Sequence, residues 1–233
     1  MLKAKKKITQ KEVQHDKFTT NYYYSAQDWY YNNKKNVNLA TGIITLLIIA
    51  SIFYYNNLNA NNETSSSELS KLTTFIDNNQ YQQAINGVPE KNIRGLLSIV
   101  ENDGSSSSGN LAKFYLANAY YSTGEFQTAL DLYEDVDVDG DIIESSRLSG
   151  IAACNEALGN FNDAAKYYEK SSAYNKNDPS IAENLLKAGI MYGKSGDNYR
   201  ATDLFERIKK DFTNSPEARE IDRYIAEYSP DKK

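Results

Sequence analysis

The stretches ANAYYSTGEFQTALDLYEDV (117–136), AACNEALGNFNDAAKYYEKS (152–171) and GIMYGKSGDNYRATDLFERI (189–208) repeat one pattern of small and aromatic residues. A glycine lies near the middle of each stretch, and the intervals between these glycines are 159 − 124 = 35 and 196 − 159 = 37 residues. An alanine follows each glycine by five residues, and an aromatic residue follows it by nine. A period near 34 residues with this layout is typical of stacked helix–turn–helix units. The sequence therefore predicts an all-α solenoid.

Each part of the pattern has a physical reason. An apolar residue stands eight positions before each glycine, and a small one follows it: Ala117, Ala152 and Gly189. Small residues let two helix backbones approach closely, and larger residues fill the space around that contact. The glycine supplies the left-handed or unhindered backbone that a turn between paired helices needs.

These residues resemble the tetratricopeptide repeat over roughly 111–215. The first unit is the closest, because Tyr120, Tyr121, Gly124, Phe126, Ala129 and Tyr133 all match the family pattern. The second unit departs from it at Asn155, and the third has Asn198 and then Tyr199 at the inter-helix aromatic position. A degenerate unit is expected upstream, where Asn79, Tyr81 and Ala84 keep the spacing. Its interval to the next turn is 124 − 79 = 45 residues, so a loop intervenes.

A second segment, LATGIITLLIIASIFYY (39–55), is apolar on every side of a helix and lies in a charge-free window from Asn36 to Asn62. Helix over 37–57 spans about 31 Å, enough for the hydrocarbon core of a membrane. Aromatic residues flank it, as in interfacial belts: Trp29, Tyr30, Tyr31, Tyr54 and Tyr55. We predict a transmembrane helix rather than a buried core helix.

The charge distribution predicts the orientation of this helix. Residues 1–36 hold eight lysines and three acidic residues, or 8 − 3 = +5, and the remainder carries 18 − 28 = −10. The positive-inside rule places the N-terminus in the cytoplasm and the repeats on the far side. A removable signal peptide fits less well, because the leader is long and 58–60 is a poor cleavage site.

The predicted organisation has six parts. They are a basic leader (1–36), a transmembrane helix (37–57), a flexible linker (58–67), a degenerate first repeat with a loop (68–109), three repeats (110–214) and a capping helix (215–233). The glycine–serine stretch 104–110 reads as the loop. Ser215 and Pro216 mark the start of the capping helix, whose apolar residues form one stripe.

Catalysis, metal binding and nucleic-acid binding find little support in this sequence. The single histidine and the single cysteine, Cys154, provide no ligand set and no nucleophile with a base, so we predict no enzyme, cofactor or metal site. Cys154 is expected to be a small packed thiol. The acidic balance of the repeat part argues against nucleic acid.

The order of leader, anchor, degenerate unit and repeats resembles a family of bacterial envelope proteins. These are the membrane-anchored tetratricopeptide proteins grouped with the ancillary subunit of the Sec translocon and with the cell-division coordinator of the periplasm. The resemblance implies a single-pass protein of the inner membrane with periplasmic repeats that bind other envelope proteins. The Sec translocase with exported clients is the first expectation. An adaptor role in cell division or outer-membrane assembly is the alternative.

In such repeats the first helix of each pair lines the concave face. The positions that point into this face predict a partner-binding surface for extended polypeptide, made of Phe114, Asn118, Tyr121, Ser149, Glu156, Ile190 and Lys194. Leu111, Glu183 and Leu186 also fall on these positions, although packing against neighbouring helices is an equal alternative for the two leucines. A clamp for a terminal carboxylate is not expected, because Phe114 occupies the position where that clamp needs lysine.

Overall fold

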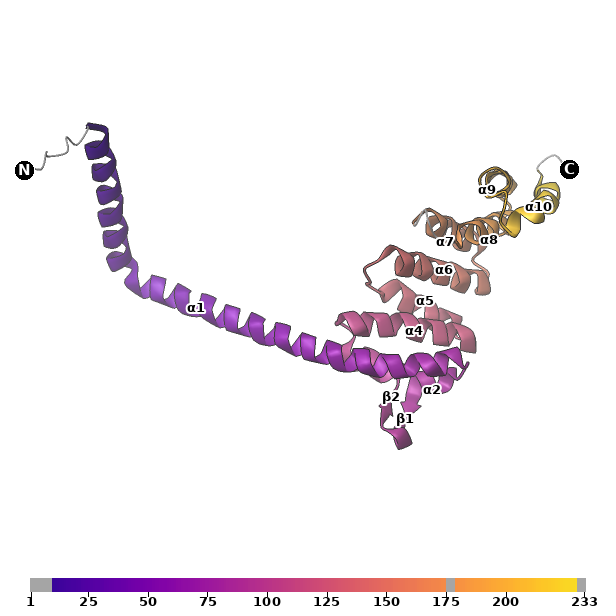
Figure 1. Cartoon of the computed structure of the whole chain (residues 1–233), viewed down its shortest axis with the longest axis horizontal. Helices are drawn as coiled ribbons and strands as arrows, with labels where there is room; N and C mark the ends of the chain where they lie inside the picture. The colour runs from indigo at the N-terminus through magenta and orange to yellow at the C-terminus, as the bar shows by residue number, and fades with distance from the viewer. Residues whose placement is uncertain (1–9, 175–178, 230–233) are drawn as a thin grey trace, which may run out of the picture. The chain divides into compact units, whose positions relative to one another are not determined.

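The computed structural model describes residues 10–174 and 179–229. The chain divides into two compact units, residues 1–57 and 58–233. The elements in chain order are α1 (Gln10–Asp77), α2 (Tyr81–Asn86), β1 (Gly87–Val88), η1 (Pro89–Lys91), β2 (Ile93–Arg94), α3 (Leu96–Asp103), α4 (Ser107–Thr123), α5 (Phe126–Asp135), α6 (Asp141–Ala157), α7 (Phe161–Tyr174), α8 (Ile181–Lys194), α9 (Asn198–Asp211), η2 (Glu217–Arg219) and α10 (Ile221–Tyr228) (Figure 1).

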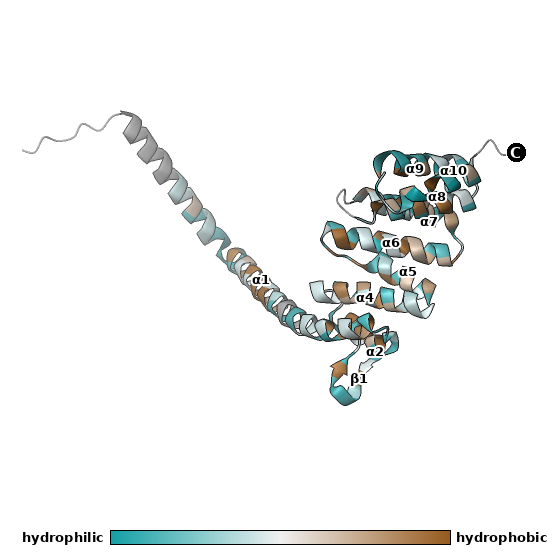
Figure 2. Ribbon diagram, turned by 45° about the vertical axis from the view of Figure 1, so that its right-hand side comes forward, coloured by the Kyte–Doolittle hydropathy of each residue, from teal (hydrophilic) through white to brown (hydrophobic). Residues whose placement is uncertain are grey.

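The first unit is the helical part of α1 up to Asn57. Within the described residues, α1 is the one helix long and apolar enough to cross a membrane, judged by length and composition. Figure 2 shows its apolar stretch in brown, and the side chains there are exposed on all sides. This stretch of α1 has no polar face.

The second unit stacks helix pairs, as the repeat predicts. The pairs α4–α5, α6–α7 and α8–α9 pack against one another in sequence order, and α10 packs on α9 (Figure 1). The end of α1 and α2 form the degenerate pair upstream. The extra residues of the 45-residue interval are the small antiparallel hairpin β1–β2, in which Val88 pairs with Ile93, and the helix α3.

The turn inside each pair has one backbone design. Gly124, Gly159 and Gly196 have φ angles of 88°, 80° and 91°, and Asn79 has 57°. At each turn, the amide of the residue with positive φ donates a hydrogen bond to the carbonyl of the residue three positions earlier. The next amide donates to the carbonyl five residues back, as from Glu125 to Tyr120 at 2.9 Å. These two bonds are the Schellman pattern that closes a helix end. The degenerate first repeat, whose turn residue is Asn79, therefore has the same turn geometry as the three regular repeats.

The core confirms the predicted small and aromatic positions. Ala129, Ala164 and Ala201 are fully buried, and the aromatic residues four positions later are buried as well. Glycines give these rings room, since a Cβ at Gly150 would lie 2.5 Å from Cζ of Tyr133, and one at Gly189 would meet the Phe205 ring. Cys154 is buried, as predicted.

The predicted flexible linker over 58–67 is wrong, because α1 continues through it as helix. Asn62 accepts a hydrogen bond from the Ser108 amide at 2.7 Å, and the buried Ser65 donates to Asp103 at 2.7 Å. Arg94 holds the same corner by pairing with both Glu68 and Asp103. The polar composition indicates a loop, but tertiary contacts override the weak helix propensity of serine and asparagine.

Three further sequence expectations differ from the structure in detail. Ser106 caps α4 by accepting from the Gly109 amide at 3.0 Å, so α4 begins inside the predicted loop 104–110. Ser215 accepts from the Ala218 amide at 3.2 Å, but a 3₁₀ turn follows, and α10 starts only at Ile221. Tyr199 is 78% exposed, so it is not an inter-helix aromatic residue.

Candidate protein-binding face

The first helices of the three regular pairs, α4, α6 and α8, carry the predicted partner-binding residues. We call this surface the first-helix face and define it by Phe114, Asn118 and Tyr121 of α4, Ser149 and Glu156 of α6, and Ile190 and Lys194 of α8. Six of these side chains are half-buried, and Lys194 is exposed. The helices that carry them also pack into the core.

The α4 part of the face is aromatic and is supported by α5. The Phe114 ring lies 5.9 Å from the Tyr133 ring, edge to face, and Tyr121 lies 5.4 Å from Phe126. Both Phe114 and Tyr121 pack against the same buried cluster, which agrees with their spacing of seven residues. These rings are therefore positioned by packing and present only part of their surface to solvent.

Asn118 lies between the two aromatic residues and is already engaged. Its Oδ1 atom accepts a hydrogen bond of 2.6 Å from the Tyr133 hydroxyl. Burial raises the pKa of Tyr133, which keeps this hydroxyl protonated as a donor. Asn118 therefore orients the Tyr133 hydroxyl through its amide oxygen.

Glu156 of α6 contacts α7. Its Oε2 atom accepts a hydrogen bond of 3.0 Å from the Tyr168 hydroxyl. Burial and the Glu156 carboxylate raise the pKa of Tyr168. Burial is also the main reason that the pKa of Tyr121 is raised; Cys154 and Glu156 raise it further, and Lys187 opposes them. In the structure, Tyr168 contacts both Glu156, through its hydroxyl, and Lys187, which lies over its ring.

The sequence-based set of binding residues misses both Lys187 and Tyr168. The Lys187 ammonium lies 5.6 Å from the centroid of the Tyr168 ring and 2.7 Å from Glu183. The spacing of four residues between Glu183 and Lys187 is the sequence signal that predicts such a pair on one helix side.

Ser149 lies on the face by position but bonds inward. Its hydroxyl lies 2.8 Å from the Ser171 hydroxyl and 3.2 Å from the Asn184 amide oxygen. Ile190 packs against the buried cluster around α8, and Lys194 lies 5.3 Å over the Phe161 ring. Leu111 and Leu186 also pack against buried clusters. The face is therefore anchored in the core at each of its three helices.

The described residues hold no group of three or more histidine, cysteine, aspartate or glutamate side chains suited to a metal ion. Cys154 lies behind the face, and burial raises the pKa of its thiol to about 12. A thiol this reluctant to ionise is a poor nucleophile. The face presents aromatic, aliphatic, amide and single charged groups.

No family model and no curated protein match this chain. Two solved structures of a kinesin light chain-like TPR repeat protein from Podosopora anserina are similar to it. One has a TM-score of 0.53 and 18% sequence identity. The other, a single-residue variant, has 0.52 and 19%. Each comparison covers 70% of this chain and 84% of the other. Identity this low shows the fold alone, which is a TPR-like α-solenoid.

Proposed function

We propose that this chain is a non-catalytic, membrane-anchored scaffold that holds other proteins on the first-helix face. The observation that carries the proposal is a TPR-like solenoid with partly exposed aromatic and aliphatic groups on its first helices. Aromatic side chains supply most of the energy at protein–protein contacts, and the Tyr121 and Phe114 rings are held in place by their neighbours. Pre-organised groups of this kind bind at a low entropic cost.

The anchor in this proposal is the apolar part of α1, with the N-terminus in the cytoplasm and the repeats outside. The support is the charge-free window and the excess of lysine in residues 1–36. Part of that leader, residues 1–9, lies outside the described residues. The resemblance to envelope tetratricopeptide proteins then extends the proposal to the bacterial inner membrane and to exported polypeptides that emerge from the Sec translocase.

Thiol labelling tests the orientation. We expect a membrane-impermeant maleimide on intact cells to modify Ser66→Cys and to spare Asp28→Cys, because both positions are exposed and lie on opposite sides of the span. The buried Cys154 can stay in place as a silent background. Labelling of position 28 with sparing of position 66 would reverse the topology.

Blocking substitutions test the face without removing packed rings. Ser122 and Ala157 are exposed positions at the C-terminal ends of α4 and α6, so Ser122→Arg with Ala157→Arg adds bulk and charge beside Tyr121 and Glu156. Gln127→Arg with Asn162→Arg adds the same charge to the exposed sides of α5 and α7.

We expect affinity capture of the full-length chain from solubilised membranes to recover Sec components and exported polypeptides. The first variant should lose them at least tenfold, a loss of about 1.4 kcal/mol or more, and the second should retain them. Equal recovery with both variants would remove the first-helix face as the binding surface. Recovery of division or outer-membrane assembly proteins in the same face-dependent manner would replace the Sec role with the adaptor role.

A further inference from the structure

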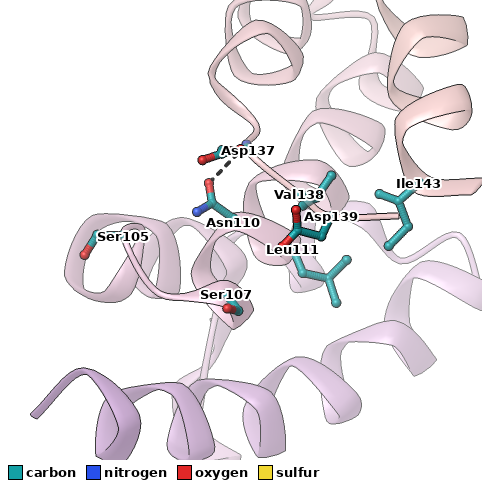
Figure 3. Close-up of a pocket in the computed structure, with 8 residues that line it drawn as sticks. All are labelled: Ser105, Ser107, Asn110, Leu111, Asp137, Val138, Asp139 and Ile143. Atoms are coloured by element: carbon teal, nitrogen blue, oxygen red, sulfur yellow. Dashed lines mark hydrogen bonds between the residues drawn. The ribbon is translucent and has the colours of Figure 1, made fainter. Parts of the chain in front are cut away.

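A cavity of about 400 Å³ opens between the start of α4, the loop after α5 and the start of α6. Its lining residues are Ser105, Ser107, Asn110, Leu111, Asp137, Val138, Asp139 and Ile143 (Figure 3). The backbone amide of Asp137 donates to the Asn110 side chain at 3.3 Å, and this bond holds the loop against α4. The volume falls within the range of about 300–1,000 Å³ that is usual for small-ligand sites.

The cavity combines an apolar wall with negative charge. Leu111, Val138 and Ile143 provide the apolar part, and the Asp137 and Asp139 carboxylates are exposed at its edge. The nearest lysine of α4, Lys113, is paired with Asp135 at 2.6 Å. Among the described residues, no lysine or arginine forms an ion pair with Asp137 or Asp139.

An anion is a poor match for this cavity, although a helix begins beside it. A helix start attracts anions through its unpaired amides. At the start of α4, the Ser108 amide already donates to Asn62 at 2.7 Å, and the Gly109 amide donates to Ser106 at 3.0 Å. These two amides of α4 are therefore engaged, and the two carboxylates at the edge of the cavity would repel an anion and attract a cation.

We propose that this cavity receives a lysine or arginine side chain of the polypeptide bound on the first-helix face. Such a side chain has an aliphatic stem and a cationic head, which match the apolar wall and the two carboxylates. The cavity also adjoins the face, since Leu111 precedes Phe114 by one helical turn on α4. This inference rests on the proposed function and adds a specificity rule to it: the partner segment carries a basic residue beside its apolar contacts.

Peptide binding to the full-length chain in detergent tests this rule by fluorescence polarisation. The probe is an end-blocked, fluorescein-labelled peptide of alternating alanine and lysine, with matched norleucine and glutamate peptides. We expect the lysine peptide alone to bind, and Asp137→Asn with Asp139→Asn to weaken binding about tenfold or more, because charge-assisted hydrogen bonds are lost. Asp203→Asn with Glu206→Gln removes the same charge from exposed positions of α9 and should change binding less than about twofold, because long-range charge is screened.

Val138→Trp fills the cavity without changing the charge and should abolish binding as well, which guards against an indirect effect of the aspartate variants. Equal weakening by the α9 pair would mean general attraction to an acidic protein, and would overturn the cavity. Absence of lysine-peptide binding, with partner capture still sensitive to Ser122→Arg and Ala157→Arg, would overturn the cavity and leave the proposed function intact.

Discussion

The two junctions on either side of the central pair α6–α7 are built from different chemistry. Toward α4–α5, the Tyr133 ring, only 3% exposed, fits against Gly150, and Ile151 and Cys154 are buried beside it. Toward α8, the buried Ser145, Ser171 and Asn184 join Ser149 in a hydrogen-bond network. Apolar residues such as Tyr168, Leu185 and Met191 are buried together at this second junction too. One repeat pattern therefore accommodates an apolar junction and a junction, here called the polar junction, that adds a buried hydrogen-bond network to its apolar contacts.

The difference shows how stability and register are divided in a solenoid. Apolar contact is non-directional and stabilises by the area removed from water. A buried hydrogen-bond network adds little net energy, but each of its groups needs its partner, so it disfavours alternative packing. We infer that the α4–α5 side depends mainly on apolar packing, whereas the α8 side adds to a larger buried apolar cluster a network that fixes how the third repeat is seated on the second.

The largest effect is expected from the apolar junction. Tyr133→Ala should lower the free energy of unfolding by about 3–5 kcal/mol, because it removes a buried ring and leaves a cavity against Gly150. Urea unfolding of the full-length chain in detergent, followed by circular dichroism, measures this. Tyr199→Ala is the matched control: its ring is 78% exposed, so its cost should stay within about 0.5 kcal/mol. Similar costs for the two tyrosines would contradict the packing at this junction.

An intermediate loss of stability is expected from a substitution in the polar junction, and two further substitutions should partly reverse it. Asn184→Leu alone should cost about 1–3 kcal/mol, because the Ser149 and Ser171 hydroxyls lose a partner inside the protein. Adding Ser149→Ala and Ser171→Ala should recover most of that loss, since no unsatisfied hydroxyl then remains at those two positions. If the triple variant is less stable than the single one by the same urea measurement, the network contributes net energy rather than register.

The smallest losses of stability are expected at the turns within the helix pairs, because all the pairs have the same turn geometry. Gly124→Ala and Gly159→Ala should each cost about 1–2 kcal/mol, because alanine is strained at their φ angles of 88° and 80°. Asn79→Gly should change stability by less than about 0.5 kcal/mol, because asparagine tolerates the left-handed region. If the two glycine substitutions lower the free energy of unfolding by clearly different amounts, the difference between the two junctions would arise from their turns rather than from their packing.

The repeat architecture follows from short-range patterns that the sequence displays directly. The spacing of Gly124, Ala129 and Tyr133 requires only one turn and one helix pair, and it is the same in each unit. Even the degenerate turn at Asn79 is predictable, because asparagine is the usual substitute for glycine there. The positions of Phe114, Asn118 and Tyr121 on one side of α4 likewise follow from their helical spacing of three and four residues.

Features that depend on distant partners are not predictable in the same way. The helix through Asn62 and Ser65 is held by residues about 40 positions away, so its composition alone indicates a linker. Tyr199 has an aromatic side chain in almost the right place, but Asn198 starts the helix and the ring faces solvent. The contacts of Tyr168 with Glu156 and Lys187, and the cavity beside Asp137, each require three elements to meet.

The buried thiol in the apolar junction offers a kinetic reporter that needs no substitution. Cys154 is the only cysteine of the chain, and it is fully shielded between α4, α5 and α6. Alkylating reagents therefore reach it only when the central repeat opens. When closing is fast relative to alkylation, the modification rate reports the population of opened molecules. A bound partner that bridges α4 and α6 would slow this reaction, so occupancy of the face becomes readable as a rate in unmodified protein.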